Sequence, residues 1–114
     1  VIYFRPSAYI FGEIADSDRF CHRLAQTLNC AVAAVEPPLA PECKFPGPFE
    51  QALKCVEYLY HYHKDWRLDR QHFALWGESS GGNLAAGLSQ ALCRMERIIS
   101  QQVLFYPMLD YSKP

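Results

Sequence analysis

Four short apolar runs alternate with amphipathic stretches along this chain of 114 residues, and the alternation limits the folds open to it. The apolar runs, residues 1–4, 30–35, 73–76 and 103–106, have the length of single strands. The stretches between them carry apolar residues three or four positions apart, as on one face of a helix. The order β-α-β-α-β-α-β predicts a parallel sheet with right-handed crossovers and helices on both faces, a three-layer α/β/α architecture.

The amphipathic stretches predict three helices, each with one apolar stripe. Asp16, Ser17 and Asp18 offer N-cap chemistry before the first helix, and the third helix is expected to begin near Asn83. The run 30–35 is continuously apolar, which predicts a strand buried on both faces. The three stripes are Phe20, Cys21, Leu24, Ala25 and Leu28; Phe49, Leu53, Val56 and Tyr60; and Leu84, Ala85, Leu88 and Leu92.

The composition is that of one globular domain, because half of the residues are hydrophobic and 14% are aromatic. The net charge is -1, and the charges are interspersed. The chain therefore has neither the basic stripe expected of a nucleic-acid-binding protein nor a polybasic arm for anionic lipid. Both classes of partner are disfavoured.

The five cysteines are widely spaced and contain no C-x-x-C pair, so the sequence indicates neither a metal site nor a disulfide framework. Reduced and mostly buried thiols are expected, as in a cytoplasmic protein. These cysteines are Cys21, Cys30, Cys43, Cys55 and Cys93.

No apolar run reaches the roughly 18 residues that span a bilayer, and no signal peptide is recognisable, which predicts a soluble protein. The chain opens on Val1, directly inside an apolar run. A four-strand parallel sheet would also leave apolar edges open, and complete folds cover or extend such edges. We therefore expect residues 1–114 to form a single partial domain, truncated at both ends.

A G-x-S-x-G motif, from Gly77 to Gly81, lies between a predicted strand and a predicted helix. This is the context of a nucleophile elbow, in which a strained turn presents the serine, here Ser79, above the sheet. The next residue, Ser80, can donate its N–H to a developing oxyanion. The alternative is a glycine-rich loop that caps a helix in a doubly wound fold. Nucleotide binding is disfavoured because neither G-x-G-x-x-G nor G-x-x-x-x-G-K-[ST] is present.

Three segments resemble motifs of the hormone-sensitive-lipase family of α/β-hydrolases. Residues 77–85 are similar to its elbow, G-D-S-A-G-G-N-L-A; residues 39–46 to its L-A-P-E-x-x-F-P loop; and residues 102–110 to its Q-x-L-x-Y-P-x-L-D strand. The resemblance implies an α/β-hydrolase fold and hydrolysis of carboxylic esters, from small or lipid-like substrates, through an acyl-enzyme on Ser79. It implies no metal and no cofactor.

The chain departs from this family where the family has H-G-G-G followed by an aromatic residue, because residues 5–9 read Arg-Pro-Ser-Ala-Tyr. The resemblance places the two oxyanion donors of that loop on the N–H groups of Ser7 and Ala8, with Ser80 as the third. Arg5 in place of histidine is compatible with a structural exchange, a sequence error or a degenerate paralogue. The altered loop keeps open a second reading, a catalytically impaired hydrolase-fold protein that binds a ligand or partner.

A serine nucleophile also needs a histidine base and a carboxylate, which in this fold follow the serine in the chain. Glu96 and Asp110 follow Ser79, but no histidine does. The base and acid are therefore expected beyond Pro114, and the 114 residues alone are expected to be inactive. Surface or packing roles are predicted for the four histidines, His22, His61, His63 and His72.

Overall fold

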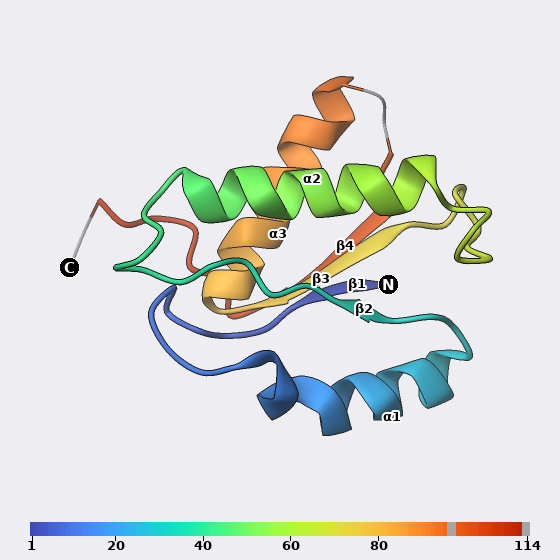
Figure 1. The fold of residues 1–114 in the computed structure, drawn as a ribbon, viewed down its shortest axis with the longest axis horizontal. Helices are drawn as coiled ribbons and strands as arrows, with labels where there is room; N and C mark the ends of the chain where they lie inside the picture. Colours follow the sequence, from blue (N-terminus) through green and yellow to red (C-terminus); the bar gives the residue numbers. More distant parts are fainter. Residues whose placement is uncertain (96–97, 113–114) are drawn as a thin grey trace.

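A computed structural model describes residues 1–95 and 98–112 as a three-layer α/β/α arrangement, which confirms the predicted fold class. Helix α1 covers one face of the central sheet, and α2 and α3 cover the other (Figure 1). The elements are β1 (Ile2–Phe4), a 3-10 turn η1 (Ile14–Ser17), α1 (Asp18–Leu28), β2 (Ala33–Ala34), α2 (Gly47–His61), β3 (Ala74–Glu78), α3 (Ser80–Met95) and β4 (Gln101–Phe105).

The sheet is parallel throughout and has the strand order β2-β1-β3-β4. In the central pair, Tyr3 lies opposite Trp76 and Phe4 opposite Gly77. Because parallel strands end at the same edge of a sheet, the segments that follow β1 and β3 meet there. This edge brings residues 5–12 next to the turn at Ser79.

The main core lies between the sheet and the pair α2 and α3. Leu75 of β3 points to this side and is fully buried against Val56 of α2 and Leu88 of α3. The neighbouring residue of β3, Trp76, points to the α1 side, as the alternation of side chains along a strand requires. Removing this much apolar surface from water provides the main driving force for the fold.

The α1 side is a smaller aromatic cluster. The Phe20 ring lies 5.2 Å from that of Tyr3 and 5.9 Å from that of Trp76, which in turn stacks on Phe105 at 5.3 Å. The predicted apolar stripe of α1 is only partly covered, since Leu24 is buried but Leu28 remains 49% exposed. A single helix on this face leaves the ends of its stripe without a packing partner.

Two local predictions are wrong. The run 30–35 contributes only the two-residue strand β2, which is partly buried because it lies at the edge of the sheet. Helix α3 begins at Ser80, three residues before the predicted Asn83. The turn between β3 and α3 is therefore reduced to Ser79 alone.

The N-cap chemistry near residue 16 acts one turn earlier than predicted. The Asp16 carboxylate accepts a hydrogen bond from the Glu13 N–H at 2.9 Å, and so it closes η1 rather than α1. Ser17 stands at the N-cap of α1 without a side-chain hydrogen bond to the helix. The helix ends as predicted near Asn29, whose left-handed backbone, with φ 49°, terminates it.

All five cysteines are free, as expected, but the prediction of burial is wrong. Cys55 and Cys93 are exposed, and the other three are partly buried. Cys30 and Cys43 lie in loops, and the other three lie on helices. None of the helices in the described residues has the length and apolar character needed to cross a membrane.

Candidate active site

Ser79 occupies a sharp bend between β3 and α3. Its φ of 55° lies in the left-handed region, which costs a non-glycine residue roughly 1 kcal/mol or more. Hydrogen bonds hold the bend on both sides: the Ser79 N–H donates to the Phe105 carbonyl at 3.0 Å, and the Ser79 carbonyl accepts from the N–H groups of Asn83 and Met108 at 3.1 and 3.2 Å. The predicted strained strand-to-helix turn is present.

Two glycines make this bend sterically possible. A Cβ on Gly77 would lie 2.7 Å from the Cα of Gly82, and a Cβ on Gly81 would lie 2.7 Å from the Arg5 carbonyl oxygen and closer still to that of Phe4. These gaps are too small for a side chain. The start of α3 can therefore pack directly against the end of β1, where the next loop begins.

The β1 loop, residues 5–12, passes over the start of α3. Ala8 and Tyr9 have φ values of 50° and 64°, and the Ser7 carbonyl accepts from the Ile10 N–H at 3.0 Å. Two central residues with positive φ are typical of a type I′ turn, which usually contains glycine or asparagine. This loop therefore holds non-glycine residues in a backbone that favours glycine.

Tyr9 ties the β1 loop to α3. Its hydroxyl lies 2.5 Å from Asn83 Oδ1 and 3.1 Å from the Ser80 carbonyl oxygen. Burial raises the pKa of Tyr9, so the phenol remains protonated and donates to these oxygens. The aromatic residue that follows the altered Arg-Pro-Ser-Ala sequence thus fixes the loop on the helix.

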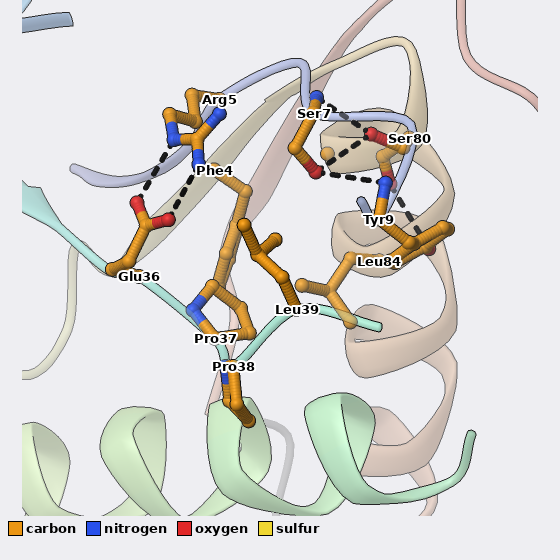
Figure 2. Close-up of a pocket in the computed structure, with 11 residues that line it drawn as sticks. Phe4, Arg5, Ser7, Tyr9, Glu36, Pro37, Pro38, Leu39, Ser80 and Leu84 are labelled. Atoms are coloured by element: carbon orange, nitrogen blue, oxygen red, sulfur yellow. Dashed lines mark hydrogen bonds and ion pairs between the residues drawn. The ribbon is translucent and has the colours of Figure 1, made fainter. Parts of the chain in front are cut away.

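The two predicted oxyanion residues Ser7 and Ser80 are brought together and bond to each other. The Ser7 N–H donates to Ser80 Oγ at 3.0 Å, and the two hydroxyl oxygens are 3.3 Å apart (Figure 2). The Tyr9 N–H donates to Ser7 Oγ at 3.0 Å. Sequence reasoning missed this contact because it concerns the side chain of Ser80, whereas the motif draws attention to its backbone.

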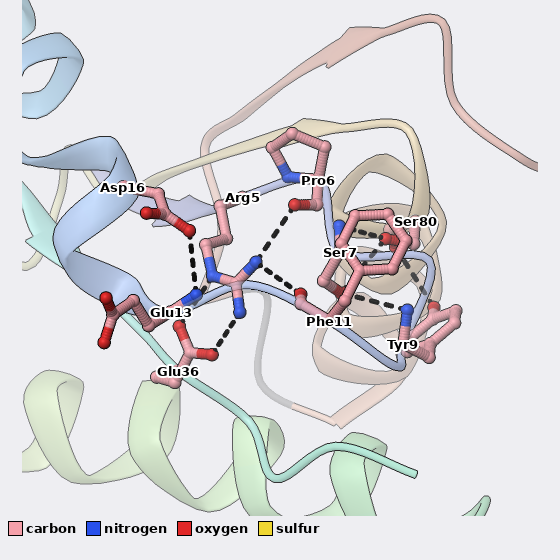
Figure 3. A network of polar contacts seen from close by, with 9 residues as sticks. All are labelled: Arg5, Pro6, Ser7, Tyr9, Phe11, Glu13, Asp16, Glu36 and Ser80. Carbon is pink, nitrogen blue, oxygen red and sulfur yellow. Dashed lines mark hydrogen bonds and ion pairs between the residues drawn. The ribbon is translucent and has the colours of Figure 1, made fainter.

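Arg5 anchors the β1 loop from inside the protein. It is only 7% exposed, and its guanidinium forms a two-pronged ion pair with Glu36, with Nε 2.9 Å from Oε2 (Figure 3). The same group donates to the carbonyls of Pro6 and Phe11 at 3.1 and 3.0 Å. The hydrogen bond with Glu36 raises the pKa of Arg5, so the guanidinium stays charged. Of the three explanations for arginine in place of the family's histidine at position 5, these contacts favour a structural exchange.

Glu36 is a functional candidate that sequence reasoning did not identify. It follows β2 at the same edge of the sheet at which Arg5 follows β1. An acidic and a basic residue placed directly after adjacent parallel strands is the signal that could have indicated the pair. A cavity of about 20 Å³ beside it, between the β1 loop and Leu84, has room for about one water molecule (Figure 2).

The histidines lie on other parts of the fold. His22, His61 and His72 are exposed and His63 is partly buried, and within residues 1–95 and 98–112 no hydrogen bond joins any of them to the Ser79 hydroxyl. His63 Nδ1 lies 3.1 Å from the Leu68 carbonyl oxygen, and His72 Nδ1 lies 2.7 Å from Asp69 Oδ2.

Of the two carboxylates that follow Ser79, the structure describes Asp110. Asp110 is exposed and accepts a hydrogen bond from the Ser112 N–H at 2.8 Å. Glu96 lies outside the described residues. The described site thus consists of the Ser79 bend, the β1 loop and the Arg5–Glu36 pair that supports the loop.

Comparison with known proteins agrees with this geometry. A family model described as alpha/beta hydrolase fold matches residues 1–114. The ethyl acetate hydrolase of Pseudomonas putida is 32% identical over 114 residues, which are 98% of this chain and 36% of that protein. The human arylacetamide deacetylase-like 2 is 34% identical over 119 residues, covering 98% of this chain and 30% of that protein.

Solved structures give the same result. EstE1, a thermophilic carboxylesterase cloned from a metagenomic library, superposes with a TM-score of 0.93 and 33% identity over 96% of this chain and 37% of its own. A bacterial heroin esterase superposes with a TM-score of 0.91 and 33% identity over 96% of this chain and 35% of its own. The chain spans about a third of the length of the relatives it matches. The family predicted from the three motifs is thereby confirmed, and the chain belongs to the hormone-sensitive-lipase-like part of the alpha/beta hydrolase fold family.

Proposed function

We propose that Ser79 is the nucleophile of a carboxylic ester hydrolase and that residues 1–114 form its nucleophile-bearing part. The observation that carries this proposal is the left-handed backbone of Ser79 at the junction of β3 and α3, at the sheet edge where the β1 loop crosses. A serine in this position can attack a substrate bound above the edge of the sheet. The names of the relatives, ethyl acetate hydrolase and carboxylesterase among them, support esters as the substrate class.

In the proposed reaction, Ser79 Oγ attacks the ester carbonyl carbon while a histidine takes the hydroxyl proton. The C–O bond to the alcohol breaks, the alcohol leaves with that proton, and an acyl-serine remains. Water then attacks the acyl-serine and releases the carboxylic acid. The backbone N–H groups near Ser79 stabilise the negative oxygen that forms in each step.

The histidine and its carboxylate partner are proposed to come from a part of the protein that follows these residues. No histidine occurs after Ser79 in the sequence, and in this fold the base and acid follow the nucleophile. The isolated 114 residues are accordingly expected to show no turnover. Small or lipid-like acyl esters are the proposed substrates, and the chemistry needs neither a metal nor a cofactor.

A fluorophosphonate probe tests this proposal in the complete protein. We expect the probe to modify Ser79, as located by peptide mass spectrometry, and Ser79→Ala to abolish both the adduct and the hydrolysis of p-nitrophenyl butyrate. Ser89→Ala is the matched control, because Ser89 lies on α3 and its buried hydroxyl has no hydrogen-bond partner among the described residues. A folded wild-type protein without a Ser79 adduct contradicts the proposal.

A second candidate is a hydrolase-fold protein that binds a ligand or partner without turnover. Two features of the β1 loop favour it: Pro6 has no N–H, and the Ser7 N–H is bonded to Ser80 Oγ. In that case the complete protein binds short-chain esters in a calorimetric titration but releases no alcohol from them and forms no adduct.

A further inference from the structure

The Ser80 hydroxyl is fully buried beneath the β1 loop. Its residue is 0% exposed, and Oγ accepts the Ser7 N–H at 3.0 Å (Figure 3). The protein around the Ser80 hydroxyl therefore shields it from solvent. Besides the Ser7 N–H, Oγ contacts the Ser7 hydroxyl, whose oxygen lies 3.3 Å away.

The peptide group that joins Pro6 to Ser7 and carries the Ser7 N–H is held in this orientation by a second hydrogen bond. This group also contains the Pro6 carbonyl, which accepts from the Arg5 guanidinium at 3.1 Å. The Ser7 side chain accepts from the Tyr9 N–H at 3.0 Å. Turning the Ser7 N–H away from Ser80 would also turn the Pro6 carbonyl away from Arg5, and a single N–H donates well in one direction only.

The other two predicted oxyanion donors are available. Among the described residues, neither the Ala8 N–H nor the Ser80 N–H has a hydrogen-bond partner. The Ser80 N–H belongs to the first turn of α3, where N–H groups lack partners within the helix and the helix dipole favours negative charge. These two groups differ in this respect from the Ser7 N–H.

We infer that the Ser80 side chain withholds the Ser7 N–H from the oxyanion, so that the N–H groups of Ala8 and Ser80 stabilise it alone. This inference rests on the proposed function. It means that the Ser80 hydroxyl lowers the rate of the reaction. The family motif that residues 77–85 resemble has alanine at this position, and alanine has no atom that could accept the Ser7 N–H. Ser80 is thus a positioning residue that acts through Ser7.

The inference predicts a gain of activity on removing the hydroxyl. Removing one oxyanion donor from a serine hydrolase typically lowers kcat by about 10² to 10³. Freeing the Ser7 N–H can therefore raise kcat by at most a comparable factor. For Ser80→Ala we expect kcat to rise by about 10-fold or more. KM should change little, because the oxyanion exists only after the substrate has bound and begun to react.

The kinetic experiment compares wild type, Ser80→Ala and Ser89→Ala in the complete protein, with p-nitrophenyl butyrate as substrate. The control removes a buried hydroxyl from the same helix without touching the β1 loop, and its kcat should equal that of wild type. A folded Ser80→Ala protein whose kcat is unchanged or lower overturns the inference. If neither wild type nor Ser80→Ala shows turnover or a Ser79 adduct, the proposed function is overturned, and this inference with it.

A measurement on wild type alone covers the case in which Ser80→Ala does not fold. A trifluoromethyl ketone forms a hemiketal with the nucleophile and places a negative oxygen where the reaction does. We expect amide proton resonances of Ala8 and Ser80 to move downfield in this complex while that of Ser7 stays in place. A comparable downfield shift of the Ser7 amide would show that it donates to the oxyanion and would refute the inference.

Discussion

The Gly81→Ala substitution tests the close approach of α3 to β1 on which the site is built. The new Cβ would lie 2.7 Å from the Arg5 carbonyl oxygen and closer still to the Phe4 carbonyl oxygen, so backbone must move by more than about 0.7 Å to reach the 3.4 Å of ordinary contact. Because β1 is paired on both sides within the sheet, it cannot move alone. Overpacking costs about 1–3 kcal/mol where side chains can adjust, and rigid backbone puts this site at about 3 kcal/mol or above.

Gly87→Ala is the matched control on the same helix. Its Cβ would lie 3.1 Å from Phe49 Cε2, the end of a side chain that can shift by a few tenths of an ångström. Alanine in a helix interior gains about 1 kcal/mol over glycine, which offsets this crowding. We expect a change in unfolding free energy between about 0 and 1 kcal/mol, in the stabilising direction.

Urea unfolding of the complete protein, followed by circular dichroism, measures both changes. We expect the midpoint of Gly81→Ala to fall while the slope of the transition stays near that of wild type. The kcat of Gly81→Ala should also fall, because the displaced Phe4 and Arg5 carbonyls begin the β1 loop. If the two variants differ by less than about 1 kcal/mol, the proposed steric role of Gly81 is wrong.

Three further predictions concern the loop and the surface. Glu36→Gln leaves the Arg5 guanidinium buried without a carboxylate and should lower the unfolding free energy by about 2 kcal/mol in the same urea assay. This cost is below the roughly 3–5 kcal/mol for breaking a fully buried pair, because the Glu36 side chain is 29% exposed. Ala8→Gly relieves a positive φ of 50° and should raise the unfolding free energy by about 0.5–1 kcal/mol, again from the urea midpoint. The hydrogen bond from His72 lowers the pKa of Asp69. The stabilisation from this bond is therefore present above the ordinary pKa of an aspartate and is lost as the pH falls through the lowered pKa. In His72→Ala, we expect the carboxyl titration of Asp69, followed by NMR, to move to higher pH.

Several features could be predicted from the sequence because they depend on neighbours along the chain. The period of apolar residues indicated the helices, and the short apolar runs indicated the parallel strands that the structure contains. Gly77 and Gly81 flank a serine between a strand and a helix, which was sufficient to predict the strained turn at Ser79. Backbone sterics near one residue require no knowledge of the rest of the fold.

Burial was predicted less well. The apolar run at residues 30–35 looked like an interior strand, yet its two-residue strand β2 lies at an edge. Leu28 belongs to an apolar stripe but remains half exposed. Strand order and the coverage of each face depend on how all elements pack, and composition carries no information on either.

The amino-acid sequence by itself determined the alternation of strands and helices, the family, and the sharp turn that presents Ser79, since each follows from short-range periodicity or motif. Only the tertiary structure decided that Arg5 pairs with Glu36, 31 residues away, and that the Ser7 N–H bonds to Ser80 Oγ, 73 residues away. These contacts arise because parallel strands end at one edge of the sheet and bring separate loops together. The direction of a single N–H group within that edge depends on packing, which a linear pattern does not encode.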